Sequence, residues 1–297
     1  MSTFCRRLIS FAGSTIAIDV AGQQAADIVS FLYRDIPDVP MIDAGPTTML
    51  RLVSPKSDRQ SFELYRDDQL LYESDNTTAM AERLLGESCY HLADRSQGGL
   101  LFHAACVQRD GKGIMLVGES GAGKSTLTVW LLTQGFSYLT DELVFIPFGT
   151  CTLQTFTRPL NLKSTSRPVI QHLIDFDAVE PFCLRSSATD LIPATVIQPQ
   201  SVKSDPELDL IIFPHYQSEM PFSLDALSKA KAGLSLMEGV VNARNLPDHG
   251  FDAITALAKR TPAYKMVYAD FAQVEGKVDD LLTTATAQSQ PQVAHGR

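Results

Sequence analysis

A phosphate-binding pattern lies near the middle of the chain. The segment reads Gly-Glu-Ser-Gly-Ala-Gly-Lys-Ser-Thr and matches G-x-x-x-x-G-K-[ST]. In this pattern the glycines let the backbone turn so that N–H groups point at phosphate, and the lysine reaches the β- and γ-phosphates. The serine hydroxyl that follows is a ligand for Mg²⁺. We therefore expect a site for ATP and Mg²⁺ that contains Gly118, Glu119, Ser120, Gly121, Ala122, Gly123, Lys124, Ser125 and Thr126.

The flanks of this loop have the structure that the pattern requires. The apolar run 113–117 before it is typical of a buried strand, and the apolar run 127–132 after it is typical of a helix that stops at Gly135. Such a helix directs the positive end of its dipole at the phosphates. The flanks favour a nucleotide site over an ordinary glycine-rich turn.

Two neighbouring acids, Asp141 and Glu142, follow the loop, and the first lies 17 residues after Lys124. They end a short strand-like segment and precede another apolar run, so we expect them at a strand end beside the loop. Carboxylates there can bind Mg²⁺ and can take a proton from an attacking hydroxyl. The alternative is a pair of acids in a surface turn. We assign Ser125, Asp141 and Glu142 as the metal ligands.

His103 lies in an apolar run, 15 residues before Gly118. The run turns at 110–113, a hairpin signal, into the strand that leads to the loop. If the two strands pair antiparallel, the imidazole lies at the end where the phosphate loop begins. That position favours a role at the phosphate site. The alternative is a histidine whose partners lie within the core.

Two basic residues, Arg158 and Lys163, lie on either side of Pro159 in a predicted loop after the strand-like run 152–156. We expect them to bind phosphate or to orient the acceptor, and a solvated surface is the alternative. Further along, 209–216 has the pattern of a buried strand, and His215 at its end is a candidate to face the cleft.

The histidine, the hairpin, the loop and the acid pair together resemble the kinase core of the HPr kinase/phosphorylase family. Enzymes of that family phosphorylate a serine of a small carrier protein, and their fold is related to ATP-dependent phosphoenolpyruvate carboxykinase. The match is closest over residues 99–146 and extends more weakly to 158–163, 208–216 and the C-terminal helices. These later features look more like the HPr-kinase-related kinases found with peptide-modification systems.

The resemblance implies a role for individual residues. Asp141 would be the general base on the acceptor hydroxyl, and His103 would lie beside the transferred phosphate. Lys124 would bind the β- and γ-phosphates, and Ser125 would bind the metal. In the C-terminal helices, Asn242 would lie near the nucleotide. The catalytic residues that the resemblance implies are Asp141, His103 and Lys124.

The sequence also departs from that family. Glu142 stands where the family has a second aspartate, and the segment 157–163 stands roughly where the family has a glycine-rich signature loop with a glutamate. The resemblance therefore extends to the kinase reaction, whereas these departures disfavour carrier-protein docking and the reverse phosphorylase reaction. It implies an acceptor serine on a peptide or small protein.

The chain is predicted to form two domains of the α/β class. Residues 1–98 should form a small α/β domain, residues 99–284 the nucleotide-binding kinase domain, and residues 285–297 a disordered tail rich in Thr, Ala, Gln and Ser. The kinase core is expected to be a mixed sheet flanked by helices and similar to phosphoenolpyruvate carboxykinase. In the first domain we predict strands at 15–20, 48–53, 61–66 and 69–72, and helices at 24–34 and 77–95.

Composition disfavours several classes of partner. The chain of 297 residues is 44% hydrophobic and 20% charged with a formal net charge of −9, which disfavours nucleic acid and anionic membranes as partners. No apolar stretch approaches the ~20 residues of a membrane-spanning helix. The N-terminal apolar segment is too short for a signal peptide. Five widely spaced cysteines without C-x-x-C predict reduced thiols and no zinc site. We expect a cytoplasmic enzyme, with homo-oligomerisation left open.

Three functions remain as alternatives. The first is an HPr-kinase-like serine kinase that transfers the γ-phosphate of ATP to a peptide or small protein. The second is a P-loop kinase for a small metabolite, although such enzymes usually begin with the loop and need a lid with clustered arginines. The third is a nucleotide-binding regulatory protein without transfer, which the intact Lys124, Ser125 and Asp141 disfavour.

Overall fold

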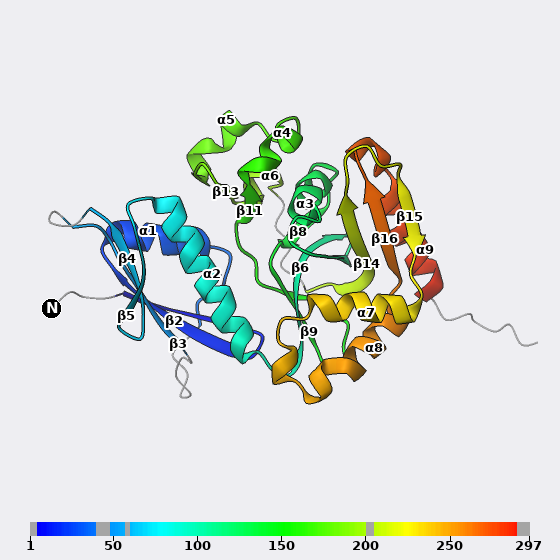
Figure 1. The fold of residues 1–297 in the computed structure, drawn as a ribbon, viewed down its shortest axis with the longest axis horizontal. Coiled ribbons are helices and arrows are strands. Elements are labelled where there is room, and N and C mark those ends of the chain that lie inside the picture. The colour runs from blue at the N-terminus through cyan, green and yellow to red at the C-terminus, as the bar shows by residue number, and fades with distance from the viewer. Residues whose placement is uncertain (1–4, 40–47, 57–59, 200–204, 290–297) are drawn as a thin grey trace, which may run out of the picture.

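The computed structural model describes residues 5–39, 48–56, 60–199 and 205–289, which form two α/β regions (Figure 1). The first region contains a mixed sheet with strand order β1-β2-β3-β4-β5. Only the β2–β3 pair is parallel among the described strands of this sheet. The strands are β1 (Cys5–Phe11), β2 (Ser14–Ala21), β3 (Thr48–Val53), β4 (Phe62–Arg66) and β5 (Gln69–Ser74).

Two helices, α1 (Gln23–Leu32) and α2 (Thr77–Arg95), pack on this sheet. Helix α2 begins at Asn76, whose side chain accepts a hydrogen bond of 2.9 Å from the Ala79 N–H and so caps the helix. Its buried side chains recur at helical spacing and include Met80, Leu84, Leu85 and Leu92. In Figure 1, α2 lies on the side of the first region that faces the second region.

The second region is built on a larger mixed sheet with order β10-β9-β6-β7-β14-β16-β15, in which β8 also pairs with β6. Strands β7, β14 and β16 are mutually parallel, and β6 is antiparallel to β7, β8 and β9. The strands are β6 (Gly99–Arg109), β7 (Lys112–Val117), β8 (Ser137–Thr140), β9 (Leu143–Pro147), β10 (Gln154–Thr155), β14 (Glu207–Tyr216), β15 (Ser223–Ala226) and β16 (Ala263–Tyr268).

Helices cover both faces of this sheet because its central strands are apolar on both sides. On β7, Ile114 and Leu116 pack with α3 and α9, whereas Met115 and Val117 pack with α7 and α8. The strand that leads into the phosphate loop is therefore buried on both faces. The helices are α3 (Lys124–Thr133), α7 (Lys229–Gly239), α8 (Phe251–Arg260) and α9 (Lys277–Ser289).

A small sheet with order β11-β13-β12 lies next to α3 and carries short helices. Asp190 on β13 is buried and forms ion pairs with Arg167 (2.7 Å) and Arg185 (3.0 Å), which tie this segment together. Its elements are β11 (Leu160–Lys163), α4 (Arg167–Ile170), α5 (Phe176–Val179), β12 (Leu184–Arg185), β13 (Thr189–Ile192) and α6 (Ala194–Ile197).

The apolar core of the first region continues into the second. Phe11 contacts Phe145 and Phe156 with ring centroids 6.4 Å and 5.5 Å apart, and Tyr33 lies 6.4 Å from Phe156. Leu101 belongs to the same buried cluster. Residue 98 lies between α2 and β6, but buried side chains from the two regions pack together in one apolar cluster.

Most predicted elements lie within two residues of the observed ones, but the C-terminal tail differs. Helix α9 continues to Ser289, so residues 285–289 are helical and not part of a disordered tail. The helix persists because Leu281, Leu282 and Ala285 are buried, and the first two pack beneath the sheet. The rest of the predicted tail, 290–297, lies outside the described residues. Strand β1 and the small sheet were not predicted.

In the part of the chain that the structure describes, no helix combines the length and apolarity needed to cross a membrane.

Candidate functional site

The phosphate-binding pattern forms the turn between β7 and α3. Gly121 and Gly123 have φ of 93° and 94°, values that favour glycine. A Cβ on Gly123 would lie 2.8 Å from the Tyr268 hydroxyl and 3.0 Å from the Tyr216 Cβ, so a larger residue does not fit. The sequence thus specifies a tight loop whose backbone reaches the N-terminus of α3.

Lys124 is the first residue of α3 and is buried. Its Nζ donates hydrogen bonds to the carbonyl oxygens of Gly118 (2.6 Å) and Glu119 (3.1 Å). Burial lowers the pKa of the amine, and the nearby carboxylates of Glu142 and Asp141 partly oppose that shift. A cation held inside the loop by carbonyl groups can exchange those contacts for phosphate oxygens.

The β6–β7 hairpin brings His103 to the loop, as its spacing predicted. Ala104 pairs with Val117, so His103 stands at the level where β7 enters the loop. On its other side β6 pairs with β9, which places His103 opposite Leu143. The His103 Nδ1 lies 3.2 Å from Glu142 Oε1, and the side chain is 40% exposed. The histidine therefore links the hairpin to the acid pair and is not enclosed in the core.

The two acids share one guanidinium. Arg158 Nη2 lies 3.2 Å from Asp141 Oδ1 and also donates a hydrogen bond to Glu142 Oε2. Its side chain is only 3% exposed. Burial alone would lower its pKa, but the adjacent Asp141 and Glu142 raise it, so Arg158 stays charged. The structure brings Arg158 to the site but pairs its guanidinium with the two acids, whereas the sequence predicted a contact with phosphate or with the acceptor.

Asp141 and Glu142 have opposite pKa shifts. Asp141 is buried, and this desolvation raises the pKa although Arg158 opposes it. Its Oδ1 accepts a hydrogen bond from the Tyr138 hydroxyl (3.0 Å), and its Oδ2 accepts one from the Asn161 N–H (3.1 Å). Glu142 is also desolvated, but Arg158 and His103 outweigh that cost and lower its pKa to about 2. Two neighbouring carboxylates with divergent pKa values are suited to different chemical roles.

A second group of side chains faces the loop from β11 and its neighbours. Lys163 Nζ donates to Ser120 Oγ at 3.1 Å, and the hydroxyls of Thr126 and Ser166 are 3.5 Å apart. Asn161 uses its side-chain Nδ2 to contact Glu82 Oε1 of helix α2 at 3.4 Å. These contacts close the site opposite the loop and extend it to the first region of the fold.

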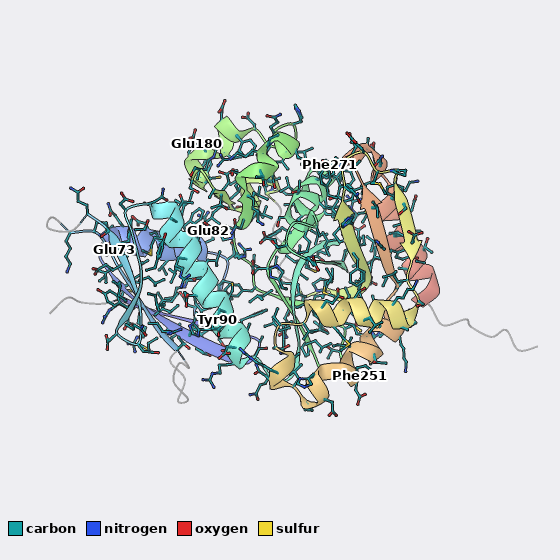
Figure 2. All side chains as sticks on the ribbon, viewed as in Figure 1. Glu73, Glu82, Tyr90, Glu180, Phe251 and Phe271 are labelled. Carbon is teal, nitrogen blue, oxygen red and sulfur yellow. The ribbon has the colours of Figure 1, made fainter. Side chains whose placement is uncertain are left out.

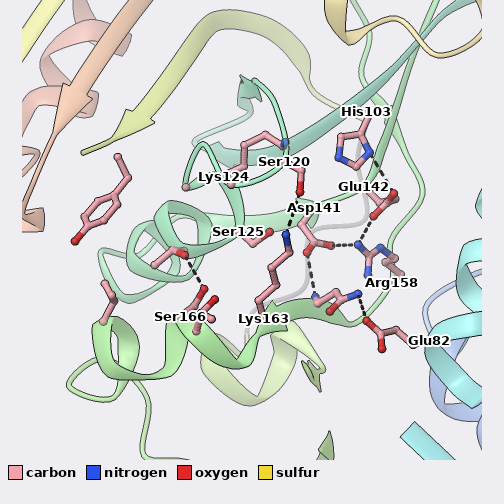
Figure 3. A pocket seen from close by; sticks show the side chains of 17 residues that line it. Glu82, His103, Ser120, Lys124, Ser125, Asp141, Glu142, Arg158, Lys163 and Ser166 are labelled. Carbon is pink, nitrogen blue, oxygen red and sulfur yellow. Dashed lines mark hydrogen bonds and ion pairs between the residues drawn. The ribbon is translucent and has the colours of Figure 1, made fainter. Parts of the chain in front are cut away.

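These residues line one pocket of about 440 Å³ (Figure 3). Of the residues predicted from the sequence, the pocket wall contains His103, Ser120, Gly121, Gly123, Lys124, Ser125, Thr126, Asp141, Glu142, Arg158 and Lys163. The remaining loop residues, Gly118, Glu119 and Ala122, complete the turn without lining the pocket. The wall also contains residues that were not predicted as site residues: Glu82, Asn161, Thr165, Ser166, Val169 and Tyr216.

Two further candidates from the sequence lie elsewhere. Asn242 is fully buried and does not line the pocket. Its side chain accepts a hydrogen bond from the Leu101 N–H (2.9 Å) and donates to the Gly99 carbonyl (3.0 Å), so it fixes the start of β6. His215 is exposed near the end of β14, and the next residue, Tyr216, is the one that reaches the pocket wall.

The residues present fit a magnesium nucleotide. The positive φ angles of Gly121 and Gly123 shape the turn at the N-terminus of α3, and Lys124 and Lys163 supply positive charge. The Ser125 hydroxyl and the Glu142 carboxylate are oxygen donors of the kind that Mg²⁺ prefers. Among the described residues, no cluster of three or more His, Cys, Asp or Glu could hold a metal ion alone. Phosphate oxygens would therefore have to complete the coordination.

Comparisons with known proteins give matches among solved structures alone. No protein-family model and no curated protein matches the sequence. Among solved structures, the chain is similar to the HPr(Ser) kinase/phosphatase from Coxiella burnetii, with 13% sequence identity and a TM-score of 0.33. The likeness covers 63% of this chain and 97% of that one. With so low a TM-score, this likeness carries no argument about the chain, whose chemistry is therefore argued from its own pocket.

Proposed function

We propose that the protein is an ATP-dependent kinase that transfers the γ-phosphate to a hydroxyl, a serine of a peptide or small protein. The observation that carries the proposal is the pocket itself. It joins a phosphate-binding loop with an intact lysine to a buried carboxylate whose pKa is raised. A phosphate cradle and a base on opposite walls are the parts that phosphoryl transfer to a hydroxyl requires.

In the proposed reaction the acceptor oxygen forms a bond to the γ-phosphorus, and the bond from that phosphorus to the β,γ-bridging oxygen breaks. The bonding pair leaves with ADP, and the hydroxyl proton passes to Asp141. A raised pKa suits Asp141 to this role because a base works best when its pKa lies near the operating pH. Lys124 stabilises the charge that develops on the transferred group.

In the proposal, Glu142 is a ligand of Mg²⁺ and not the base. Its pKa of about 2 keeps it ionised, and its side chain is more exposed than that of Asp141, at 26% against 1%. Ser125, Glu142 and an oxygen of Asp141 would hold Mg²⁺, which when bound supplies positive charge to the β- and γ-phosphates. The His103 Nδ1 lies 3.2 Å from Glu142 Oε1, and both side chains line the same pocket.

The class of acceptor rests on less direct support. A carboxylate or phosphate acceptor would need a cationic pocket of its own. Lys163 is the cation of the facing wall that has no carboxylate partner among the described residues, because Arg158 is held by the acids. A hydroxyl acceptor has no such need. The choice of a peptide, of a cytoplasmic setting and of a phosphoenolpyruvate-carboxykinase-like core follows the sequence resemblance and belongs to the proposal.

One observation favours a second candidate, a nucleotide-binding regulatory protein. Both carboxylate oxygens of Asp141 already accept hydrogen bonds, and the side chain is 1% exposed. A base in this state has to release Arg158 or Tyr138 before it can meet a hydroxyl. If it never does so, the pocket binds nucleotide without transfer.

The test uses γ-labelled ATP, Mg²⁺ and a library of serine-containing peptides, with a pool of small hydroxyl metabolites in a parallel reaction. Mass spectrometry locates the phosphate, and the matched control is the Lys124→Ala protein at the same concentration. We expect label on peptide serines with the wild-type protein and no label with the Lys124→Ala protein. Label only on a metabolite would favour the small-metabolite kinase, and nucleotide binding with no transfer would favour the regulatory protein.

A further inference from the structure

Helix α2 of the first region contributes a side chain to the pocket. Glu82 lies on α2, yet it lines the same pocket as Asp141 and Lys163 (Figure 3). The bridge is Asn161, whose backbone N–H bonds Asp141 Oδ2 at 3.1 Å and whose side chain bonds Glu82 Oε1 at 3.4 Å. A single residue, Asn161, therefore contacts both the proposed base Asp141 and Glu82.

The same glutamate also lines a shallow groove on the outer side of α2. The groove is walled by Tyr72 of β5 and by Tyr90, which is 57% exposed, and it has Ala79 and Gly86 along its length. Figure 2 shows Glu82 and Tyr90 along the same helix. Because Glu82 lines both cavities, the groove and the pocket where phosphoryl transfer is proposed meet at this side chain.

The charge of the groove is concentrated at this junction. Arg83 and Glu87 form an ion pair of 2.6 Å with each other, and the guanidinium of Arg83 lies over the ring of Tyr72. Within the described parts of the chain, no lysine or arginine forms an ion pair with Glu82, which has only the Asn161 amide as a hydrogen-bond partner. A cation brought by another molecule would therefore complete the site at Glu82.

Gly86 supports a docking role independently. It lies in the middle of the 19-residue helix α2, where glycine is less favourable than alanine. An added Cβ would meet no atom of the protein within 4 Å, so internal packing does not explain the glycine. A residue without a side chain at the floor of a groove lets the backbone of a bound chain approach closely.

We propose that the groove along α2 holds the acceptor polypeptide in an extended conformation and that Glu82 selects a lysine or arginine near the phosphorylated serine. This inference rests on the proposed kinase function and adds the sequence class of the acceptor. An extended chain rises about 3.3 Å per residue, so the basic residue should lie one to about three positions from the serine. Helix α2 thus gives the first region of the fold a role in substrate recognition.

The experiment uses serine peptides that differ only at these flanking positions, with lysine, alanine or glutamate there. Initial rates of phosphate transfer give kcat/KM for each peptide. We expect the wild-type protein to prefer the lysine peptides over the glutamate peptides by about tenfold. In the Glu82→Lys protein the preference should reverse toward glutamate, because the junction then carries the opposite charge.

Gly86 tests the groove separately from the charge. Gly86→Leu should raise KM for the lysine peptides by about tenfold, because its side chain fills the groove floor, while KM for ATP and Tm are maintained. Gly86→Ala should raise Tm and still raise the peptide KM. The matched control is Gly233→Ala in helix α7, where the added Cβ makes an ordinary 3.8 Å contact with Ala258 and the peptide KM should not change.

The outcomes separate this inference from the proposed function. If peptides are phosphorylated at equal rates whatever their flanking charge, or if Gly86→Leu leaves the peptide KM unchanged, the groove is not the acceptor site although the kinase remains. If no peptide in the library accepts phosphate from the wild-type protein while nucleotide binds, the peptide-kinase function fails and the inference fails with it.

Discussion

The two walls of the pocket are built in different ways. The loop wall is one continuous segment between β7 and α3, and its key atoms belong to residues that are close in sequence. The facing wall is assembled from α2, β11 and the segment after β8, whose residues are brought together by Arg158 and Asn161. We infer that the loop wall binds and stabilises phosphate, whereas the facing wall contributes the proton-accepting carboxylate, part of the folding stability and the choice of acceptor.

The largest effect is expected at the loop wall. Lys124→Ala should lower phosphate transfer by about 10³ or more, because the ammonium stabilises charge that develops on the transferred group. Stability should change little, since the buried amine is already desolvated and its pKa is lowered. The measurement is kcat/KM for transfer beside a thermal melt. Lys163→Ala on the facing wall is the matched control, with a loss of about tenfold; equal losses for the two lysines would contradict the comparison.

Removing the cation that joins the acids should affect stability first. Arg158→Ala leaves the buried Asp141 and the partly buried Glu142 without this counter-charge, and breaking a buried ion pair such as Arg158–Asp141 costs about 3–5 kcal/mol. Urea unfolding at pH 7 measures this loss. Arg185→Ala offers a control, because its partner Asp190 keeps a second arginine, Arg167. A fully stable Arg158→Ala protein would mean that the facing wall does not depend on this cluster.

The pH dependence of folding stability should reveal the ionisation of Glu142. Its folded pKa of about 2 lies below the ordinary 4.5, so folding favours the ionised form. The resulting stability, up to about 3 kcal/mol, is present above pH 4.5 and is lost as the pH falls toward 2. Asp141 has the opposite sign, because its raised pKa makes its ionisation unfavourable to folding. Comparison of the wild-type and Glu142→Gln proteins by urea unfolding from pH 7 to 2.5 isolates Glu142, and the stability gap between them should shrink in acid.

The smallest effect expected here lies outside both walls. Asn242→Ala removes a buried amide and leaves the Leu101 N–H and the Gly99 carbonyl without this partner, which should cost about 1–3 kcal/mol of folding stability. Because Asn242 does not line the pocket, KM for ATP should be unchanged in the folded variant. An increase in the KM for ATP without loss of stability would instead support the contact between Asn242 and the nucleotide that the sequence resemblance implied.

The difference between the loop wall and the facing wall also explains which site residues the sequence could predict. The phosphate loop is local, so its glycines, lysine and serine are visible in one short segment. His103 was predicted to lie by the loop because a hairpin turn fixes the register of β6 on β7. The acid pair was visible because it ends a strand directly after the loop helix.

The facing wall could not be derived in this way. Glu82 is one acidic residue on a long amphipathic helix, and nothing in its local pattern distinguishes it from a solvated charge. Asn161 was part of a segment noted for its basic residues, but its backbone contact with Asp141 depends on the path of the chain after β10. For Arg158 the sequence predicted the right pocket, whereas its burial between two carboxylates depends on packing from α2 and the first sheet.

The most direct test of the account compares nucleotide binding with phosphate transfer in the Asp141→Asn protein. Asparagine keeps the size of the side chain and one oxygen donor for Mg²⁺ but cannot take a proton, so the variant should bind Mg-ATP with nearly the wild-type Kd and lose about 10²–10⁴ of the single-turnover rate. His103→Ala should lose less, because it acts through Glu142 and the phosphate. Wild-type transfer by folded Asp141→Asn would contradict the assignment of Asp141 as the base.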